Sequence, residues 1–199
     1  MAEFKMSNTP FLIIPNAFPD HFLEEIKYCA LTNGQDGEGE VYGGGKRSQI
    51  RSSKLKWIFP EDEKSTFIFD YISKMLENTA RNYFGYEVFT NGCEGLQYTM
   101  YEYSENSKIQ DHYDWHMDCD ITGPEKTDRK VSFSLQLSEP EEYDGCRLEF
   151  VDHMNVRKED LYRKGTAIIF PSFLYHKVTP ITRGKRTSLV GWIRGPKFR

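Results

Sequence analysis

The chain has 199 residues, of which 38% are hydrophobic and 28% charged, a composition that is ordinary for one globular domain with its own core. The formal net charge of −4 at pH 7 argues against a general nucleic-acid-binding protein. Neither a signal peptide nor an apolar run of the roughly 20 residues that cross a bilayer is visible, so we expect no membrane partner and a cytoplasmic location.

The N-terminal part predicts short strands and helices. Residues 11–14 form an apolar run that stops at Pro15, which is typical of a strand. Asp20 is placed to cap a helix that ends near Asn33–Gly34, because apolar residues between these points recur at helical spacing. A second strand is expected over residues 53–59.

Six glycines lie between these elements, within residues 34–45. The composition predicts a surface loop, and a lid over a site is the functional alternative, because a lid needs hinges that absorb backbone rotation. A phosphate-binding loop is not expected, since no Gly-Lys-Ser/Thr sequence is present in this stretch.

The next segment, residues 62–84, has a helical pattern and should end at Gly85. Two apolar stripes run side by side along it. One stripe consists of Phe67, Tyr71, Met75 and Tyr83, and the other consists of Ile68, Ile72 and Leu76. The first stripe is predicted to face the core.

After Gly95 the hydrophobic period changes to two, which is typical of half-buried strands. Strands are expected over 96–101, 131–137, 146–151, 166–170, 175–179 and 187–194, with turns at Gly123-Pro124, Asp144-Gly145, Lys164-Gly165 and Arg183-Gly184. Many short antiparallel strands predict a mainly β fold, a double-stranded β-helix (jelly roll) with supporting N-terminal helices. The chain is expected to be a single domain over 1–199, with 1–94 as a buttress and 95–199 as the core that holds the site.

Two separated segments carry residue types that bind metals. His116 and Asp118 form a His-x-Asp pair, and His176 lies on a later predicted strand. Residues two apart on a strand face the same side, so the pair should aim at one point if the strand continues that far. Two imidazoles and one carboxylate occupy one face of an octahedral Fe(II) and leave the other face open. The pattern predicts a non-haem iron centre.

Strand alternation does not identify the pair uniquely. His112 and Asp114 form a second His-x-Asp with the same parity as His116 and Asp118. Cys119, beside the proposed ligand, is expected to be a small filler. The chain contains no Cys-x-x-Cys pair, so reduced thiols are expected and a zinc knuckle is not.

From about Gly95 onwards the chain resembles the Fe(II)/2-oxoglutarate-dependent dioxygenases, and within them the prolyl 4-hydroxylase-like branch that includes the PKHD-type hydroxylases. The similar stretches are the strand 96–101 that ends in Tyr, Tyr113 three residues before His116, 165–171, 176–180, Arg186-Thr187-Ser188 and Gly191-Trp192. The position of Tyr113 favours His116 over His112. Two departures are a longer segment between Tyr101 and His116, and Cys146 where the family often has glycine.

The resemblance implies a residue-by-residue assignment. His116, Asp118 and His176 would bind iron. Arg186 would pair with the far carboxylate of 2-oxoglutarate, because a planar guanidinium meets a carboxylate through two hydrogen bonds and keeps its charge. The same carboxylate would receive hydrogen bonds from Ser188 and Tyr101. The residues expected on the substrate side are Tyr113, Trp115 and Arg129.

The activity implied by the resemblance is hydroxylation of a C–H bond with O2, coupled to decarboxylation of 2-oxoglutarate to succinate, with ascorbate as an optional reductant. The expected substrate is a protein or peptide side chain, commonly proline, with a small molecule as the alternative; a homodimer is a further expectation. A carboxylate at Asp118 points to hydroxylation, or to demethylation by way of a hydroxylated methyl group, because a small residue there would open a site for halide. Two rival functions are a non-enzymatic cupin-like or lectin-like binding module and a zinc hydrolase that uses the same three ligands.

Overall fold

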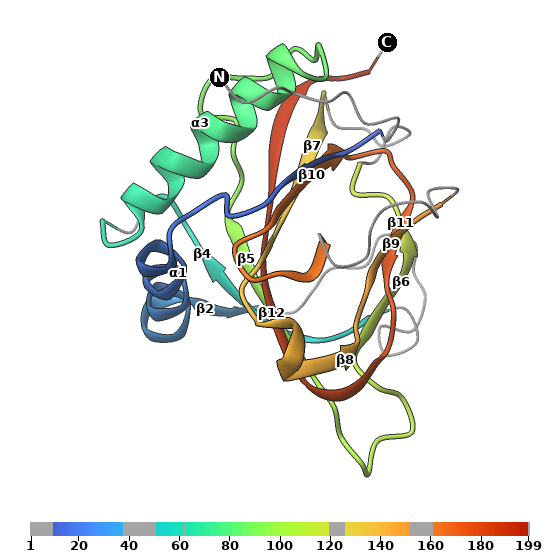
Figure 1. Ribbon diagram of the computed structural model, residues 1–199. Coiled ribbons are helices and arrows are strands. Elements are labelled where there is room, and N and C mark those ends of the chain that lie inside the picture. Colours follow the sequence, from blue (N-terminus) through green and yellow to red (C-terminus); the bar gives the residue numbers. More distant parts are fainter. Residues whose placement is uncertain (1–9, 38–50, 62, 120–125, 152–160, 199) are drawn as a thin grey trace.

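A computed structural model describes residues 10–37, 51–61, 63–119, 126–151 and 161–198, and shows two antiparallel sheets that face each other (Figure 1). Along its main path the larger sheet contains β1 (Leu12–Ile14), β10 (Ala167–Pro171), β7 (Thr127–Gln136), β12 (Ile181–Pro196), β5 (Leu96–Glu102), β4 (Lys54–Ile58) and β2 (Gln35–Gly37) in that order, and β8 (Tyr143–Gly145) pairs with β12. The smaller sheet contains β3 (Arg51–Ser52), β6 (His112–His116), β11 (His176–Val178) and β9 (Leu148–Phe150) in that order. The prediction of a mainly β jelly roll is confirmed.

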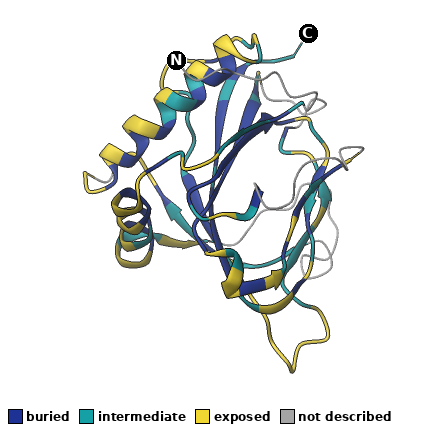
Figure 2. Ribbon diagram, viewed as in Figure 1, coloured by how far each residue is buried: buried dark blue, intermediate teal, exposed yellow. Residues whose placement is uncertain are grey.

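Two helices, α1 (Asp20–Asn33) and α3 (Thr66–Asn82), pack on the outer side of the larger sheet (Figure 1). Their buried side chains join one apolar cluster with alternate residues of the central strands, among them Leu96, Phe133 and Leu189. Figure 2 shows this buried layer between helices and sheet, with the exposed helix faces turned to solvent. The N-terminal helices therefore support the sheet, as predicted. Neither helix meets the length and apolarity required to cross a membrane.

The opposite face of the same strands is polar, although it is also buried. Strand alternation turns the neighbours of the apolar residues towards the smaller sheet. These inner-face residues are Gln97, Thr99 and Tyr101 on β5, Ser132, Ser134 and Gln136 on β7, and Arg186 and Ser188 on β12; each is less than 9% exposed. A second apolar cluster, which includes Phe150, Ile168 and Phe170, fills another part of the space between the sheets.

The predicted core stripe of the second helix is wrong for Phe67, Tyr71 and Tyr83, whereas Met75 packs against the apolar cluster. Tyr71 is 63% exposed, and Phe67 and Tyr83 are also among the exposed hydrophobic residues. The parallel stripe with Ile68 and Ile72 is buried against the sheet instead. Both stripes are apolar at helical spacing, so only the packing of the helix on the sheet decides which one faces inwards.

Other local predictions also change. Pro19 occupies the N-cap of α1, and Asp20 is the first residue of the helix. No side chain forms a capping hydrogen bond there. Part of the glycine-rich segment is not loop, because Gln35–Gly37 pairs with β4 as β2; residues 38–45, and with them the lid hypothesis, lie outside the described residues. The turn predicted at Arg183-Gly184 is instead part of the strand β12. At these residues β12 pairs with β8, which contains the turn predicted at Asp144-Gly145.

Gly184 makes this continuation of β12 geometrically feasible. Its φ of 71° lies in the left-handed region, and a Cβ added there would collide with the carbonyl oxygen of Glu142. A register shift in the β12–β8 pairing lies just before it, between Ile181 and Arg183. The glycine thus bends one long strand so that it pairs with β8 at one end and with β5 and β7 along the rest.

Candidate functional site

Three side chains from separate places in the chain converge between the sheets. His116 ends β6 and His176 begins β11, and the two residues are register partners. The Nε2 atom of His116 lies 3.7 Å from Oδ1 of Asp118, and the Nε2 atom of His176 lies 3.6 Å from Oδ2 of the same carboxylate. One ligand atom from each residue falls within 4.8 Å of the other two. This spacing suits a single ion held at the bond length of about 2 Å that His and carboxylate ligands make with metals.

A bulge in β6 decides which residues face this point. His176 pairs with His116, but Val178 pairs with Tyr113, so β6 has one residue more than β11 between the two pairs. The extra residue reverses the alternation, which puts Tyr113 on the same face as His116. Their rings stack with centroids 3.5 Å apart and planes 14° apart.

The same bulge separates the two His-x-Asp pairs that alternation left equivalent. Asp114 is exposed, and its Oδ1 accepts a hydrogen bond from the backbone N–H of Trp115 at 2.8 Å. The Nδ1 atom of His112 lies 2.8 Å from the carbonyl oxygen of Gln110. Among the described residues, only His116, Asp118 and His176 form a group with metal-binding geometry.

Backbone carbonyls orient both imidazoles. Nδ1 of His116 lies 2.7 Å from the carbonyl oxygen of Asp114, and Nδ1 of His176 lies 2.8 Å from that of Leu174. A carbonyl only accepts hydrogen bonds, so each Nδ1 carries a proton when the ring is neutral. Each Nε2 then has its lone pair directed into the site, which is the tautomer that a metal requires.

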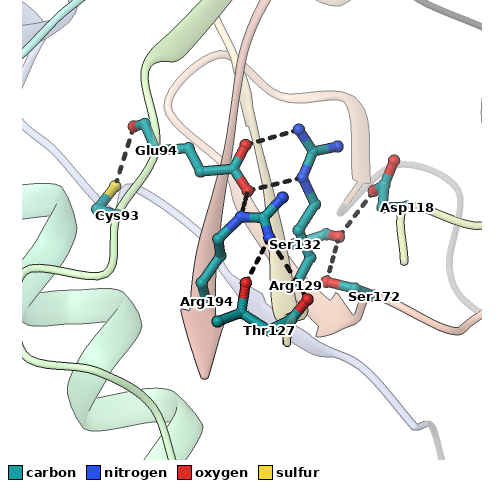
Figure 3. A network of polar contacts seen from close by, with 8 residues as sticks. All are labelled: Cys93, Glu94, Asp118, Thr127, Arg129, Ser132, Ser172 and Arg194. Atoms are coloured by element: carbon teal, nitrogen blue, oxygen red, sulfur yellow. Dashed lines mark hydrogen bonds and ion pairs between the residues drawn. The ribbon is translucent and has the colours of Figure 1, made fainter. Parts of the chain in front are cut away.

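Serines hold the carboxylate. Asp118 lies two residues beyond the end of β6, and its backbone N–H bonds to the carbonyl oxygen of Ser172 at 2.9 Å. The hydroxyl of Ser132 donates to Oδ2 of Asp118 at 2.7 Å and lies 3.0 Å from the Ser172 hydroxyl (Figure 3). The side chain is therefore fixed in place although no strand continues to residue 118. Cys119 beside it is buried.

The electrostatics favour metal-binding protonation states. Burial, with a contribution from the charge of His176, lowers the pKa of His116 to about 4. Burial alone would raise the pKa of the Asp118 carboxyl, but the two histidines lower it to about 2. At neutral pH His116 is thus a neutral imidazole and Asp118 an anion, as metal ligands must be.

A second feature of the interior is a buried arginine. Arg186 is 1% exposed, and its Nε and Nη2 atoms both donate to Oε1 of Gln136, at 3.1 and 2.9 Å. Within the described ranges no carboxylate forms an ion pair with this guanidinium. The Nε2 atom of Gln136 is buried and has no hydrogen-bond partner there either. An uncompensated buried charge costs several kcal/mol, so this cluster is suited to bind an anion.

The other two residues predicted around Arg186 lie beside it. Tyr101 is its register partner on β5, with the guanidinium carbon 5.7 Å from the ring centroid. Burial raises the pKa of the Tyr101 hydroxyl to about 12, so it stays protonated and can donate a hydrogen bond. Ser188, two residues along β12, is 2% exposed on the same face.

Sequence reasoning missed several residues of this interior. Gln136 was read only as the polar half of an alternating strand, and Ser132 likewise. Cys146 was noted only as a departure from glycine. Its backbone φ is 49°, and its sulfur lies 3.9 Å from Nη1 of Arg186. Burial raises the pKa of this thiol to about 11, so it remains a neutral wall of the arginine site.

The residues predicted on the substrate side fall in different places. Tyr113 lies against His116, as described above. Arg129 donates to both carboxylate oxygens of Glu94, at 2.9 and 2.6 Å (Figure 3). Its guanidinium carbon lies 3.9 Å from the Trp192 ring centroid. Arg194 shares the same Glu94 carboxylate at 2.7 Å.

Trp115 is not brought to the three ligand atoms. Its ring stacks on Tyr175 with centroids 5.7 Å apart, and the Lys177 ammonium lies 4.7 Å from its centroid. Tyr175 and Lys177 flank His176 and therefore face the other side of the chain from its imidazole. The role of Trp115 as a substrate contact stays a prediction.

Comparisons with known proteins identify similar sequences and folds. Residues 96–194 match the family model of the 2OG-Fe(II) oxygenase superfamily. The chain is 37% identical over 82 residues to a PKHD-type hydroxylase of Maricaulis maris, and 40% identical over 88 residues to one of Hyphomonas neptunium. These alignments cover 41% and 42% of this chain but only 36% and 38% of the relatives, so the chain matches well under two thirds of their length.

Solved structures extend the likeness of the fold over nearly the whole chain. A viral collagen prolyl hydroxylase from Paramecium bursaria Chlorella virus-1, in complex with 2OG, matches with a TM-score of 0.69 at 20% identity, over 94% of this chain and 97% of that one. A prolyl hydroxylase from Trichoplax adhaerens, in complex with a hypoxia inducible factor peptide fragment, matches with a TM-score of 0.71 at 18% identity, over 94% and 84%.

Proposed function

Because the chain belongs to the 2OG-Fe(II) oxygenase superfamily, we propose that it is a 2-oxoglutarate-dependent hydroxylase that acts on a peptide side chain. The observation that supports this most directly is the pairing of two features in one interior: a His-Asp-His group with metal-binding spacing, and a buried arginine for which the described residues supply no counter-ion. An enzyme that binds a metal ion and a dicarboxylate needs both.

In this proposal His116, Asp118 and His176 bind Fe(II). The fit rests on their donor set, two nitrogens and one carboxylate oxygen, and on their oriented Nε2 atoms. These three protein ligands would leave the ion accessible to the co-substrate. Ser132 restrains the carboxylate, so that the three donors need little rearrangement when the ion binds.

Arg186 binds the far carboxylate of 2-oxoglutarate. A dicarboxylate supplies the counter-charge that the described part of the protein lacks, and its oxygens accept from the guanidinium. Tyr101, protonated at neutral pH, and Ser188 add hydrogen bonds, and the orphaned Nε2 of Gln136 is a further donor. The Cys146 thiol closes the wall beside Nη1 and excludes water from the ion pair.

When bound, Fe(II) and 2-oxoglutarate supply the oxidising chemistry: 2-oxoglutarate and O2 are converted to succinate and carbon dioxide, and one oxygen atom enters a C–H bond of the substrate. The protein contributes binding, orientation and the exclusion of water. Tyr113, stacked on His116, holds that imidazole against rotation. We also assign Arg129, which Glu94 holds over Trp192, to the substrate side; the supporting observation is that its charge lowers the pKa of Asp118.

A peptide substrate is supported by the kind of enzyme this fold resembles. Both solved structures named above are prolyl hydroxylases, and one of them contains a peptide. Each is less than 25% identical to this chain, so the likeness shows the fold alone. We propose a peptide substrate on this basis, and proline is the first residue type to test. A small molecule is the alternative.

Succinate formation tests the proposal. The purified protein is incubated with Fe(II), 2-oxoglutarate and air, with and without a panel of proline-containing peptides, and succinate is quantified. We expect succinate that depends on iron, oxygen and 2-oxoglutarate, and a mass increase of about 16 Da on an accepted peptide, the mass of one inserted oxygen atom. Ester or amide hydrolysis with Zn²⁺ and no consumption of 2-oxoglutarate would support a hydrolase, and absence of both turnover and iron binding would support a binding module.

A further inference from the structure

A second arginine in the interior is not used by the proposed reaction. Arg51 belongs to β3, at the edge of the smaller sheet, and pairs in register with Tyr113. Its Nη2 atom donates to Oε1 of Gln97 on β5 at 2.7 Å, and its Nε atom donates to the Ser53 hydroxyl at 3.1 Å. The side chain therefore spans from the smaller sheet to the polar inner face of the larger one.

The charge of Arg51 has no acidic partner among the described residues. Other arginines do have one: Arg129 and Arg194 share Glu94, and Arg183 pairs with Asp144. In the interior, Arg51 shares this lack of an acid with Arg186, which is already assigned to the co-substrate. Arg51 differs from Arg186 in being partly exposed, so a group that arrives from solvent can reach it.

Arg51 lies close to the proposed iron site. Its guanidinium carbon is 4.6 Å from the Tyr113 ring centroid, and the Tyr113 ring is in turn 3.5 Å from that of His116. Its positive charge also lowers the pKa of Tyr101, against the larger effect of burial. The arginine is thus one aromatic ring away from a metal ligand and near the tyrosine assigned to 2-oxoglutarate.

We propose that Arg51 binds a carboxylate of the substrate and makes the enzyme selective for an acidic residue next to the hydroxylated position. This inference rests on the proposed function. One face of the guanidinium lies on Tyr113, and Nε and Nη2 bond to Ser53 and Gln97. The Nη edge is the part of the fork that pairs with a carboxylate. The near carboxylate of 2-oxoglutarate is the less suitable partner, because the Tyr113 ring separates Arg51 from His116.

Two matched peptides provide the probe: one proline-containing sequence with Glu beside the proline, and the same sequence with Gln there. Wild-type protein should turn over the Glu peptide with a kcat/KM at least about tenfold higher, the effect of one charged hydrogen-bonded pair. Arg51→Gln should abolish the preference and leave the KM for 2-oxoglutarate within about twofold. Arg51→Lys should keep part of the preference, because the charge remains without the planar fork.

Lys54→Gln is the matched control. It removes one positive charge three residues further on, from an exposed side chain that pairs with Glu102 outside the interior. It should keep the preference for Glu, and thermal unfolding of all three variants checks that they fold. Equal turnover of the two peptides by wild type, or a preference that survives in Arg51→Gln, overturns the proposal. A large rise in the KM for 2-oxoglutarate in Arg51→Gln does so too, because it assigns Arg51 to the co-substrate.

A failure of the proposed function gives a different result. In that case no protein forms succinate with either peptide, and binding of the same two peptides is measured by calorimetry instead. Tighter binding of the Glu peptide to wild type than to Arg51→Gln would support Arg51 as a binding site for an acidic residue, even though the protein is not a hydroxylase. Equal binding, or no binding of the Glu peptide, would overturn the proposed role of Arg51 as well.

Discussion

The two faces of the larger sheet are equally buried but differ in chemistry. The outer face contributes Leu96, Phe133 and Leu189 to an apolar cluster beneath α1 and α3. The inner face, one residue along on the same strands, presents Gln97, Ser132 and Ser188 to the smaller sheet. Burial of polar side chains is costly unless partners satisfy them. The inner face keeps polar groups and a guanidinium for which the described residues supply no acid, as the proposed binding role requires, whereas the outer face is structural.

The largest expected effect concerns the three ligand residues. Asp118→Ala or His176→Ala should abolish 2-oxoglutarate turnover, because two ligands do not hold the ion in a defined geometry. His112→Ala should retain most of the activity, because the bulge in β6 leaves His112 on the opposite face of the strand from His116. Succinate formation measures both. An inactive His112→Ala together with an active His116→Ala would show that the wrong His-x-Asp pair has been assigned.

The next effect separates affinity from stability at Arg186. Arg186→Met should raise the KM for 2-oxoglutarate by roughly 30-fold or more, the loss expected when one partner of a buried charged pair is truncated. The same change removes a buried charge that has no counter-ion among the described residues, so the protein without 2-oxoglutarate should be no less stable than wild type. Steady-state kinetics and thermal unfolding in the absence of co-substrate test this pair of results. A variant with unchanged KM would contradict the role of Arg186.

Leu189→Ala makes the corresponding change on the outer face of the same strand. Leu189 is fully buried against the helices, and its truncation should lower the free energy of unfolding by about 2–5 kcal/mol. The KM for 2-oxoglutarate should be unchanged in the folded fraction. Denaturant unfolding measures the first quantity. Tyr71→Ala is the control, because its side chain is 63% exposed and its loss should change stability by about 0.5 kcal/mol or less.

The smallest predicted effect concerns the hydroxyl that restrains Asp118. Ser132→Ala should weaken metal affinity by about 10- to 100-fold, as is typical when a residue that orients a metal ligand is lost. Titration with Co(II), followed by its absorption bands, measures the affinity without turnover. Ser138→Ala is the matched control, since this buried serine bonds to Thr187 instead. Equal Co(II) affinities in the two variants would show that Ser132 has no positioning role.

Much of the fold was visible in the sequence because it depends on local pattern. Alternation over 96–101 and 131–137 predicted strands that the structure contains within β5 and β7. The helix over Asp20–Asn33 was also correct, since its apolar spacing and its terminal glycine are local signals. Errors arose where two local readings were equally good: on α3, two adjacent stripes had the same period, and contact with the sheet selected the aliphatic one.

For the site, the sequence by itself determined which residue types are available and in what order they occur along the chain. They are a His-x-Asp, a distant His and an Arg-x-Ser. Tertiary structure alone decided which residues meet. The bulge in β6 directs His116 rather than His112 to His176, and strand pairing brings Gln136 to Arg186 and Arg51 to Gln97. The physical reason is that register and bulges follow from hydrogen bonding between strands far apart in the chain, and this pairing leaves no mark in a local pattern.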